Sequence, residues 1–204
     1  MTPWRKLLYK ELSNLSFSGK VLDLGGATGS DYHALIGGTH EITTVNIDES
    51  HQHDLSFNLE GKFPIEGGKY DAVLAINVME HIYNYEQFLK EIYRVLKLGG
   101  TAVVAVPFLV QVHPSPKDYF RFTDAALQKV LSGARFYDIK IKIIGTGVGL
   151  ARAQIFYNAL RFAPLQFLAE VTGKIFDHIV SLLKKESFFS GKYYPLGYFV
   201  IVRK

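Results

Sequence analysis

Residues 20–30 read Lys-Val-Leu-Asp-Leu-Gly-Gly-Ala-Thr-Gly-Ser, an apolar strand that contains one acid and runs into a glycine-rich turn. Gly25, Gly26 and Gly29 have no Cβ, so the backbone can bend sharply there and a ligand can approach it closely. A helix predicted over 30–36 would aim its free N–H groups at that ligand. This order of elements is typical of a nucleotide-type cofactor site in a doubly wound α/β domain.

The glycine spacing indicates which cofactor the turn suits. A dinucleotide fingerprint has the spacing Gly-x-Gly-x-x-Gly, which lets a pyrophosphate rest on the helix N-terminus. Here the spacing is Gly25-x-Ala27-x-Gly29, and Asp23 lies just before it, where an acid suits an ammonium group better than a pyrophosphate. The segment resembles motif I of class I S-adenosylmethionine-dependent methyltransferases, with Ala27 in place of the usual middle glycine. The resemblance implies that Asp23 and the turn, Gly26 included, hold the amino-acid end of S-adenosylmethionine.

The composition excludes several classes of protein. The chain has 204 residues, 48% of them hydrophobic, which is enough for one well-cored domain, 1–204. The absence of cysteine excludes disulfides and thiolate metal sites, and it fits a cytoplasmic location. No signal peptide and no run of about 18 apolar residues is found. The net charge is only +4 and the lysines and arginines are scattered, so no nucleic-acid partner is expected.

Apolar strands alternate with helical stretches, which predicts a mostly parallel sheet covered on both faces. Strands are predicted over 20–25, 41–48, 71–77, 101–106, 136–144 and 193–202, and helices over 4–12, 30–36, 84–97 and 123–132. The helix over 84–97 has a capping box in Asn84 and Gln87 at its start and Gly99-Gly100 after its end.

The resemblance extends over residues 20–144 and 193–203. It implies a Rossmann-like, seven-stranded, mostly parallel sheet whose last strand is antiparallel. It also implies that residues 150–190 are a helical insertion before that strand.

Acids that follow the second strand are candidates for the ribose and adenine contacts. Asp48 lies about twenty residues beyond the turn, where a carboxylate can accept both ribose hydroxyls; a surface or capping aspartate is the alternative. Asp54-Leu55 resembles the family's pair that flanks adenine, with the carboxylate on the exocyclic amine and the Leu55 N–H on a ring nitrogen. Local turn-capping by Asp54 is the alternative. His51 and His53 have no accompanying ligand cluster, so they are expected to be solvated and no metal site is expected.

Two later segments are expected to border the acceptor. Asn77-Val78-Met79-Glu80-His81 resembles the family's segment that ends in Glu-His, which implies a cofactor contact by Asn77. His81 could act as general base for a hydroxyl or amine acceptor, or Glu80 and His81 could be polar packing.

The proline-stiffened loop over 107–123 carries His113, Asp118, Tyr119 and Arg121, which are candidates for acceptor handling. Arg121 could form a structural clamp with Asp118, or it could bind an acidic acceptor.

Residues 150–190 combine many apolar side chains with a polar stripe at helical spacing. The stripe comprises Lys174, Asp177, His178, Ser181, Lys184 and Lys185. Together with Arg152 and Arg161, the stripe indicates one of two roles. The segment could be a lid that covers an apolar acceptor, or an interfacial helix that contacts a membrane peripherally. Packing against the domain or against a dimer partner is the alternative, and the sequence leaves the oligomeric state open.

The sequence therefore predicts S-adenosylmethionine-dependent methyl transfer to a small-molecule acceptor, lipid- or glycan-linked. A non-catalytic interaction protein that docks on a membrane or a partner through 150–190 is the main alternative. A nicotinamide-dependent oxidoreductase would require a glycine spacing that the chain lacks.

Overall fold

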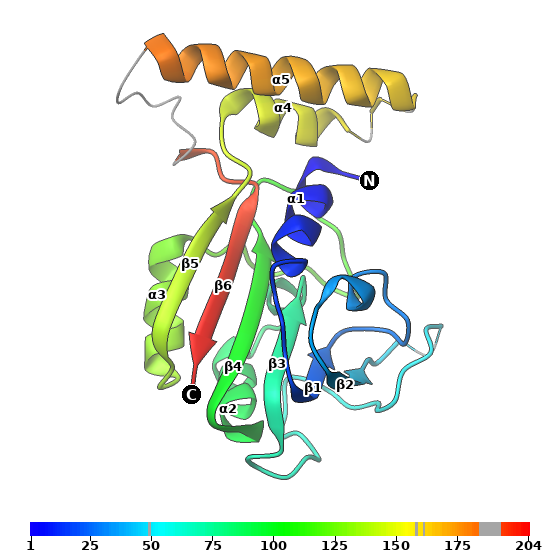
Figure 1. Ribbon diagram of the computed structural model, residues 1–204, viewed down its shortest axis with the longest axis vertical. Coiled ribbons are helices and arrows are strands. Elements are labelled where there is room, and N and C mark those ends of the chain that lie inside the picture. Colours follow the sequence, from blue (N-terminus) through cyan, green and yellow to red (C-terminus); the bar gives the residue numbers. More distant parts are fainter. Residues whose placement is uncertain (49, 158, 161, 184–192) are drawn as a thin grey trace.

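The computed structural model describes residues 1–48, 50–157, 159–160, 162–183 and 193–204 (Figure 1). Its elements are α1 (Pro3–Leu12), β1 (Gly19–Leu24), the 3₁₀ turn η1 (His33–Leu35), β2 (His40–Val45), β3 (Tyr70–Ile76), the 3₁₀ turn η2 (Met79–His81), α2 (Tyr85–Val95), β4 (Leu96–Pro107), α3 (Asp124–Gly133), β5 (Tyr137–Ile144), α4 (Val148–Phe156), α5 (Ala163–Leu183) and β6 (Gly197–Arg203).

The described strands form one six-stranded sheet in the order β2-β1-β3-β4-β6-β5. The first four strands are parallel, and β6 runs antiparallel to both of its neighbours, β4 and β5. The predicted mostly parallel sheet with an antiparallel last strand is therefore confirmed. Leu24 at the end of β1 is level with Val45 of β2 and Ala75 of β3. The residues that follow these three strands consequently emerge side by side at one edge.

Alternate residues of the central strands point to opposite faces of the sheet, as the period of two requires. Leu22 and Leu24 pack into a core with α2 and α3, whereas Val21 packs into the core on the other face with α1. Figure 1 shows α1 in front of the sheet and α2 and α3 behind it. The cover on both faces is what the doubly wound prediction requires.

The expected seventh strand is absent from the described residues, so that part of the prediction is wrong. Leu55 makes a single parallel bridge to Val45 at the outer edge of β2, and the chain then turns away. Residues 56–69 contain one proline and three glycines, namely Pro64, Gly61, Gly67 and Gly68, which weaken strand pairing.

The helix predicted over 30–36 is also wrong, because the chain forms only the short turn η1 there. Gly37 and Gly38 follow at once, and the few residues before them cannot offset the cost of starting an α-helix. No helix N-terminus therefore faces the glycine turn within the described part of this segment.

Helix α2 exists as predicted, but its start and end differ from the prediction. Asn84 does not cap it; its side-chain amide donates to the carbonyl of Glu60 instead, at 3.4 Å. The helix ends at Val95, and β4 begins at Leu96, earlier than the glycine pair suggested. The helix predicted over 123–132 is confirmed as α3, whose first turn is capped by Thr123.

Helices α4 and α5 lie between β5 and β6 and cross at two glycines, where a Cβ on Gly149 or Gly173 would collide with the other's backbone. Asp177 accepts hydrogen bonds from the N–H groups of Gly149 and Leu150, at 2.8 and 2.9 Å. Asp177, a member of the predicted polar stripe, therefore caps α4. Three basic residues that the sequence pattern places in or near this stripe lie outside the described residues: Arg161, Lys184 and Lys185.

An ion pair on α2 fixes the loop that leads into β3. Glu91 is buried, and its carboxylate accepts the N–H of Phe63 at 2.7 Å and the Arg94 guanidinium at 2.6 Å. Arg94 also donates to the carbonyls of Phe63 and Ile65, at 3.0 and 2.8 Å. One side chain thus satisfies a buried acid and two loop carbonyls together.

Replacing Arg94 by Met should lower the free energy of unfolding by about 3 kcal/mol, because Glu91 would remain buried without a cation. The control is Lys97→Met, which removes an exposed pair with Asp71 and should cost less than about 1 kcal/mol. Urea denaturation measures both values. Equal losses in the two variants would contradict the anchoring role of Arg94.

Candidate functional site

The carboxyl ends of β1, β2 and β3 open on a cavity of about 710 Å³, a size that suits a small molecule. Eight of the predicted site residues line it: Gly25, Gly26, Ala27, Gly29, Asp48, Asn77, His81 and Tyr119. The other six lie outside this lining: Asp23, Asp54, Leu55, His113, Asp118 and Arg121.

The glycine turn is shaped by its neighbours on both sides. Gly25 has a φ of +79°, and a Cβ there would collide with the side chain of Val78, so the position favours glycine twice over. The side-chain amide of Asn46 donates to the carbonyls of Gly25 and Gly26, both at 3.3 Å. Asn46 also lines the cavity. The sequence reasoning missed this residue, although it stands at the end of a strand on the same edge as Asp48.

Asp23 lies fully buried beneath the turn, and its Oδ2 accepts the hydroxyl of Tyr32 at 2.5 Å and bonds Nε2 of His33 at 2.7 Å. Burial raises the pKa of Asp23, and the hydrogen bonds from His33 and Tyr32 oppose that rise. A Cβ on Gly26 would collide with this carboxylate. Asp23 therefore lies outside the cavity lining and positions Tyr32, which does line the cavity; its contact with an ammonium group stays a prediction.

Asp48 lines the cavity three residues beyond the end of β2, and its side chain is 53% exposed. Ser50 N–H donates to one carboxylate oxygen at 2.9 Å, and His51 Nδ1 lies 3.2 Å from the other. The hydrogen bonds from Ser50 and His51 hold the pKa of Asp48 below its ordinary value. An ionised carboxylate thus faces the cavity with acceptor capacity for hydroxyl groups.

Asp54 and Leu55, the predicted adenine contacts, lie outside the cavity lining and have hydrogen-bond partners on β2. Asp54 accepts the N–H and the hydroxyl of Thr44, both at 2.8 Å, and these bonds lower its pKa. The Leu55 N–H donates to the carbonyl of Thr44 at 3.0 Å. The local capping alternative therefore describes Asp54, and Phe57 and Leu59 line this side of the cavity instead.

Asn77 lines the cavity at the end of β3 in a left-handed conformation, with a φ of +54°. Its side-chain oxygen accepts the indole N–H of Trp4 at 3.1 Å, and its own N–H donates to Ala105 at 2.9 Å. Trp4 is buried and is the one tryptophan of the chain. Helix α1 therefore takes part in shaping the site, a role that its sequence did not reveal.

The opposite end of the cavity is formed by η2 and the loop after β4. His81 Nδ1 donates to the carbonyl of Lys117 at 2.7 Å, and Tyr119 N–H donates to the carbonyl of Glu80 at 2.8 Å. These bonds join two segments that are far apart in the sequence. His81, Lys117 and Tyr119 consequently line one wall.

Asp118 and Arg121 form the clamp that was one of the two sequence-based alternatives. The guanidinium contacts both carboxylate oxygens and holds the pKa of Asp118 at about 2. Asp118 also accepts the N–H of His113 at 3.0 Å, and Arg121 donates to the carbonyl of Phe120 at 2.8 Å. The pair stiffens the loop behind the cavity wall, and neither residue lines the cavity.

Comparison with known proteins now bears on this site. A family model described as a methyltransferase domain matches residues 3–138. An uncharacterised protein of Methanocaldococcus jannaschii is 33% identical over 115 residues, 50% of this chain and 49% of that protein. A Mycolicibacterium smegmatis protein named "Probable S-adenosylmethionine-dependent methyltransferase" is 23% identical over 161 residues, 72% of this chain and 63% of that protein.

The chain thus spans about half to two thirds of the length of these curated relatives. The crystal structure of a SAM-dependent methyltransferase from Archaeoglobus fulgidus shares the fold, with a TM-score of 0.62 and 16% identity over 98% of this chain and 94% of that chain. The family match covers most of the chain and includes the glycine turn, Asp48 and Asn77. The chain belongs to the family of class I S-adenosylmethionine-dependent methyltransferases.

Proposed function

We propose that the protein transfers the methyl group of S-adenosylmethionine to a small-molecule acceptor within this cavity. The observation that carries the proposal is the pairing of the glycine turn with the ionised Asp48 on one wall of a 710 Å³ cavity. A wall built from His81 and Tyr119 completes the cavity and is the candidate acceptor end.

The residues present fit the cofactor. Asp48 would accept the ribose hydroxyls, and the turn together with Asn77 would hold the amino-acid end, where Gly25 leaves space that a Cβ would fill. Phe57 and Leu59 offer apolar contacts for adenine. The bound cofactor supplies an already activated sulfonium methyl group. The chain's own task is then to align the acceptor atom and exclude water.

We further propose that residues 1–204 act as one methyltransferase domain in which 150–190 serve as a docking element or lid. The non-catalytic alternative is disfavoured because the ionised Asp48 faces a cavity of ligand size. A nicotinamide dinucleotide is disfavoured because no α-helix follows the turn among the described residues to receive a pyrophosphate.

Replacing Asp48 by Ala should weaken S-adenosylmethionine binding by at least about tenfold, because the ribose hydroxyls would lose their acceptor. Trp4 provides the signal, since its indole bonds Asn77 in the cavity wall and no second tryptophan competes. The measurement is the change in tryptophan fluorescence during titration. Glu66→Ala, which removes one carboxylate from an exposed loop, is the control and should bind as the parent does. Unchanged affinity of the Asp48 variant would refute the ribose assignment.

We also propose that α4 and α5 bring the protein to membrane surfaces, which would suit a lipid-linked acceptor. The two helices and the residues between them expose Ile155, Phe156, Phe162, Leu165, Phe167, Leu168, Ile175, Phe176, Ile179 and Leu182, each at least 47% accessible. Exposed Arg152 and Lys174 accompany these residues, as in helices that bind anionic lipid surfaces. None of the described helices is long and apolar enough to cross a membrane.

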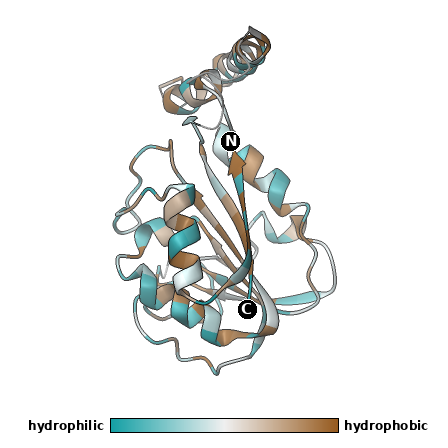
Figure 2. Ribbon diagram, turned by 90° about the vertical axis from the view of Figure 1, so that its left-hand side faces the viewer, coloured by the Kyte–Doolittle hydropathy of each residue, from teal (hydrophilic) through white to brown (hydrophobic). Residues whose placement is uncertain are grey.

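The position of these helices supports the same proposal. They lie beyond the ends to which β3 and β5 point, the end at which the cavity opens (Figure 1). Viewed from the side, the pair lies at one end of the molecule, beside the start of α1 (Figure 2), to which it is joined by the ion pair of Lys6 with Glu170. Apolar side chains there would reach a lipid surface without disturbing the core.

Flotation with vesicles that contain anionic phospholipid tests this proposal. The parent protein should float, and the double variant Phe167→Asp/Leu182→Asp should stay in the dense fraction, since two charges would enter the apolar contact. Leu98→Asp changes a leucine that is 90% exposed at another site and should float like the parent. A parent protein that stays with the dense fraction and sediments as a dimer would assign the surface to a second copy instead.

A further inference from the structure

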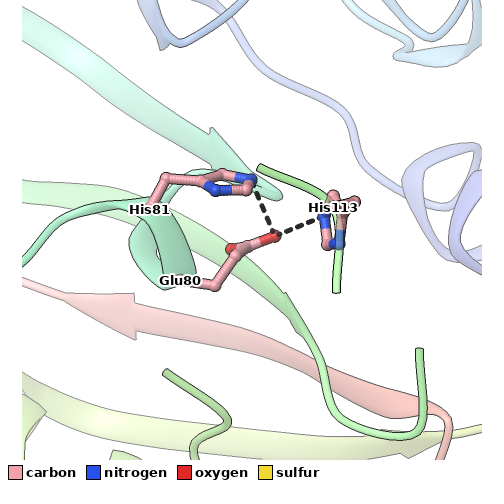
Figure 3. Close-up of side chains that lie close together, drawn as sticks. All are labelled: Glu80, His81 and His113. Carbon is pink, nitrogen blue, oxygen red and sulfur yellow. Dashed lines mark ion pairs between the residues drawn. The ribbon is translucent and has the colours of Figure 1, made fainter. Parts of the chain in front are cut away.

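We propose that Glu80, His81 and His113 bind one divalent transition-metal ion at the acceptor end of the cavity (Figure 3). Glu80 and His81 come from η2, and His113 comes from the loop that follows β4. The sequence reasoning considered only His51 and His53 as metal ligands and therefore did not find this cluster.

The distances suit an ion between the three side chains. Glu80 Oε1 lies 3.7 Å from Nε2 of His81 and 3.7 Å from Nε2 of His113, and all three ligand atoms lie within 4.8 Å of one another. Two ligands that are each about 2.1 Å from a tetrahedral zinc ion are separated by about 3.4 Å. Shifts of a few tenths of an ångström to about 1 Å would therefore complete the site.

The carboxylate of Glu80 has an unusual environment. Its side chain is fully buried, and neither oxygen has a hydrogen-bond partner among the residues that the structure describes. A buried carboxylate without a partner is costly, and a cation bound beside it would offset that cost. Arg121 does not serve this purpose directly, because its guanidinium bonds Asp118 and loop carbonyls.

The tautomers of both histidines prepare them as ligands. Nδ1 of His81 lies 2.7 Å from the carbonyl of Lys117, and Nδ1 of His113 lies 3.0 Å from the carbonyl of Gln111. A carbonyl can only accept, so each Nδ1 carries the proton and each neutral ring keeps a lone pair on Nε2. Both lone pairs then face the same carboxylate. Backbone carbonyls fix the tautomer of metal-binding histidines in this manner.

A proton is the competing occupant. The carboxylate of Glu80, whose Oε1 lies 3.7 Å from Nε2 of His113, raises the pKa of His113, so an imidazolium–carboxylate ion pair forms where a metal ion is scarce. The charged and titratable groups that face this imidazole are Glu80, His81 and Asp118, and Asp118 is itself paired with Arg121. A metal ion can bind His113 only after that proton leaves. Titration with the metal alone therefore shows whether a metal ion can replace the proton between the three side chains.

Two imidazoles and one carboxylate suit Zn²⁺, Fe²⁺ or Co²⁺ rather than Ca²⁺, which prefers oxygen ligands throughout. Three protein ligands leave a coordination position open. Because His81 lines the cavity, that position is accessible to an acceptor oxygen or nitrogen; this last step alone rests on the proposed methyl transfer. A bound metal ion would occupy Nε2 of His81, the ring nitrogen that a general base would use. His81 would then be a metal ligand and not the general base that the sequence suggested.

The test uses chelator-treated full-length protein titrated with Co²⁺ for visible absorption and with Zn²⁺ for calorimetry. The parent should bind one ion of each metal. Glu80→Gln, which keeps the side-chain shape, and His113→Gln should each weaken binding by at least about tenfold. His178→Gln removes a histidine on the exposed surface of α5 and should bind as the parent does. Zn²⁺ should also raise the unfolding temperature of the parent, a readout that needs no variant.

Binding that is equally strong in Glu80→Gln, His113→Gln and His178→Gln would overturn the site, as would a parent that binds neither metal. S-adenosylmethionine is titrated separately into the metal-free parent. Because none of the three ligands belongs to the cofactor wall, it should bind there unchanged. A parent protein that binds S-adenosylmethionine but neither metal refutes this site alone, whereas a parent protein that does not bind S-adenosylmethionine refutes the proposed function.

Discussion

The parallel register of β1 between β2 and β3 is the constraint on which the site depends. It places Leu24 level with Val45 and Ala75, so that the glycine turn, the loop after β2 and the segment after β3 leave the sheet together. Val78 packs into the space that Gly25 leaves free, which brings the last of these segments against the turn. A side chain at position 25 would push them apart and open the cofactor wall.

The opposite wall of the cavity depends on a second set of contacts, made by the backbone of Glu80. Its carbonyl accepts the N–H groups of Tyr119 and Phe120, at 2.8 and 3.2 Å, and so ties η2 to the loop after β4. The clamp of Arg121 on Asp118 stiffens the same loop. The two walls of the cavity are thus held by different interactions.

Local patterns were sufficient to predict the strands at the centre of the sheet and the helices α1, α2 and α3. Leu22 and Leu24 alternate with Val21, and such a period of two is visible in any sequence. Spacing also predicted that Asp48 lies at the cavity, because the position of an acid after the second strand follows from the topology. Sequence patterns predicted the ends of helices less well than their existence. Asn84, for example, was expected to cap α2 but bonds the carbonyl of Glu60 instead.

Contacts between distant segments could not be predicted in this way. From its sequence context, Asp54 could either bind a ligand or cap a local turn. The structure shows that its carboxylate accepts hydrogen bonds from Thr44, next to the bridge between Val45 and Leu55. The approach of His113 to Glu80 likewise depends on how the loop after β4 folds back on η2. Asp23 lies beneath the turn because Tyr32 and His33 reach it, a contact that the motif does not encode.

The central claim is that the cavity binds S-adenosylmethionine. Calorimetric titration of the purified protein with S-adenosylmethionine, S-adenosylhomocysteine and NAD tests it most directly. The account predicts one site per chain that binds the first two ligands with dissociation constants on the order of micromolar, about −8 kcal/mol, and does not bind NAD. Absence of binding by both sulfur ligands, or binding of NAD alone, would contradict it.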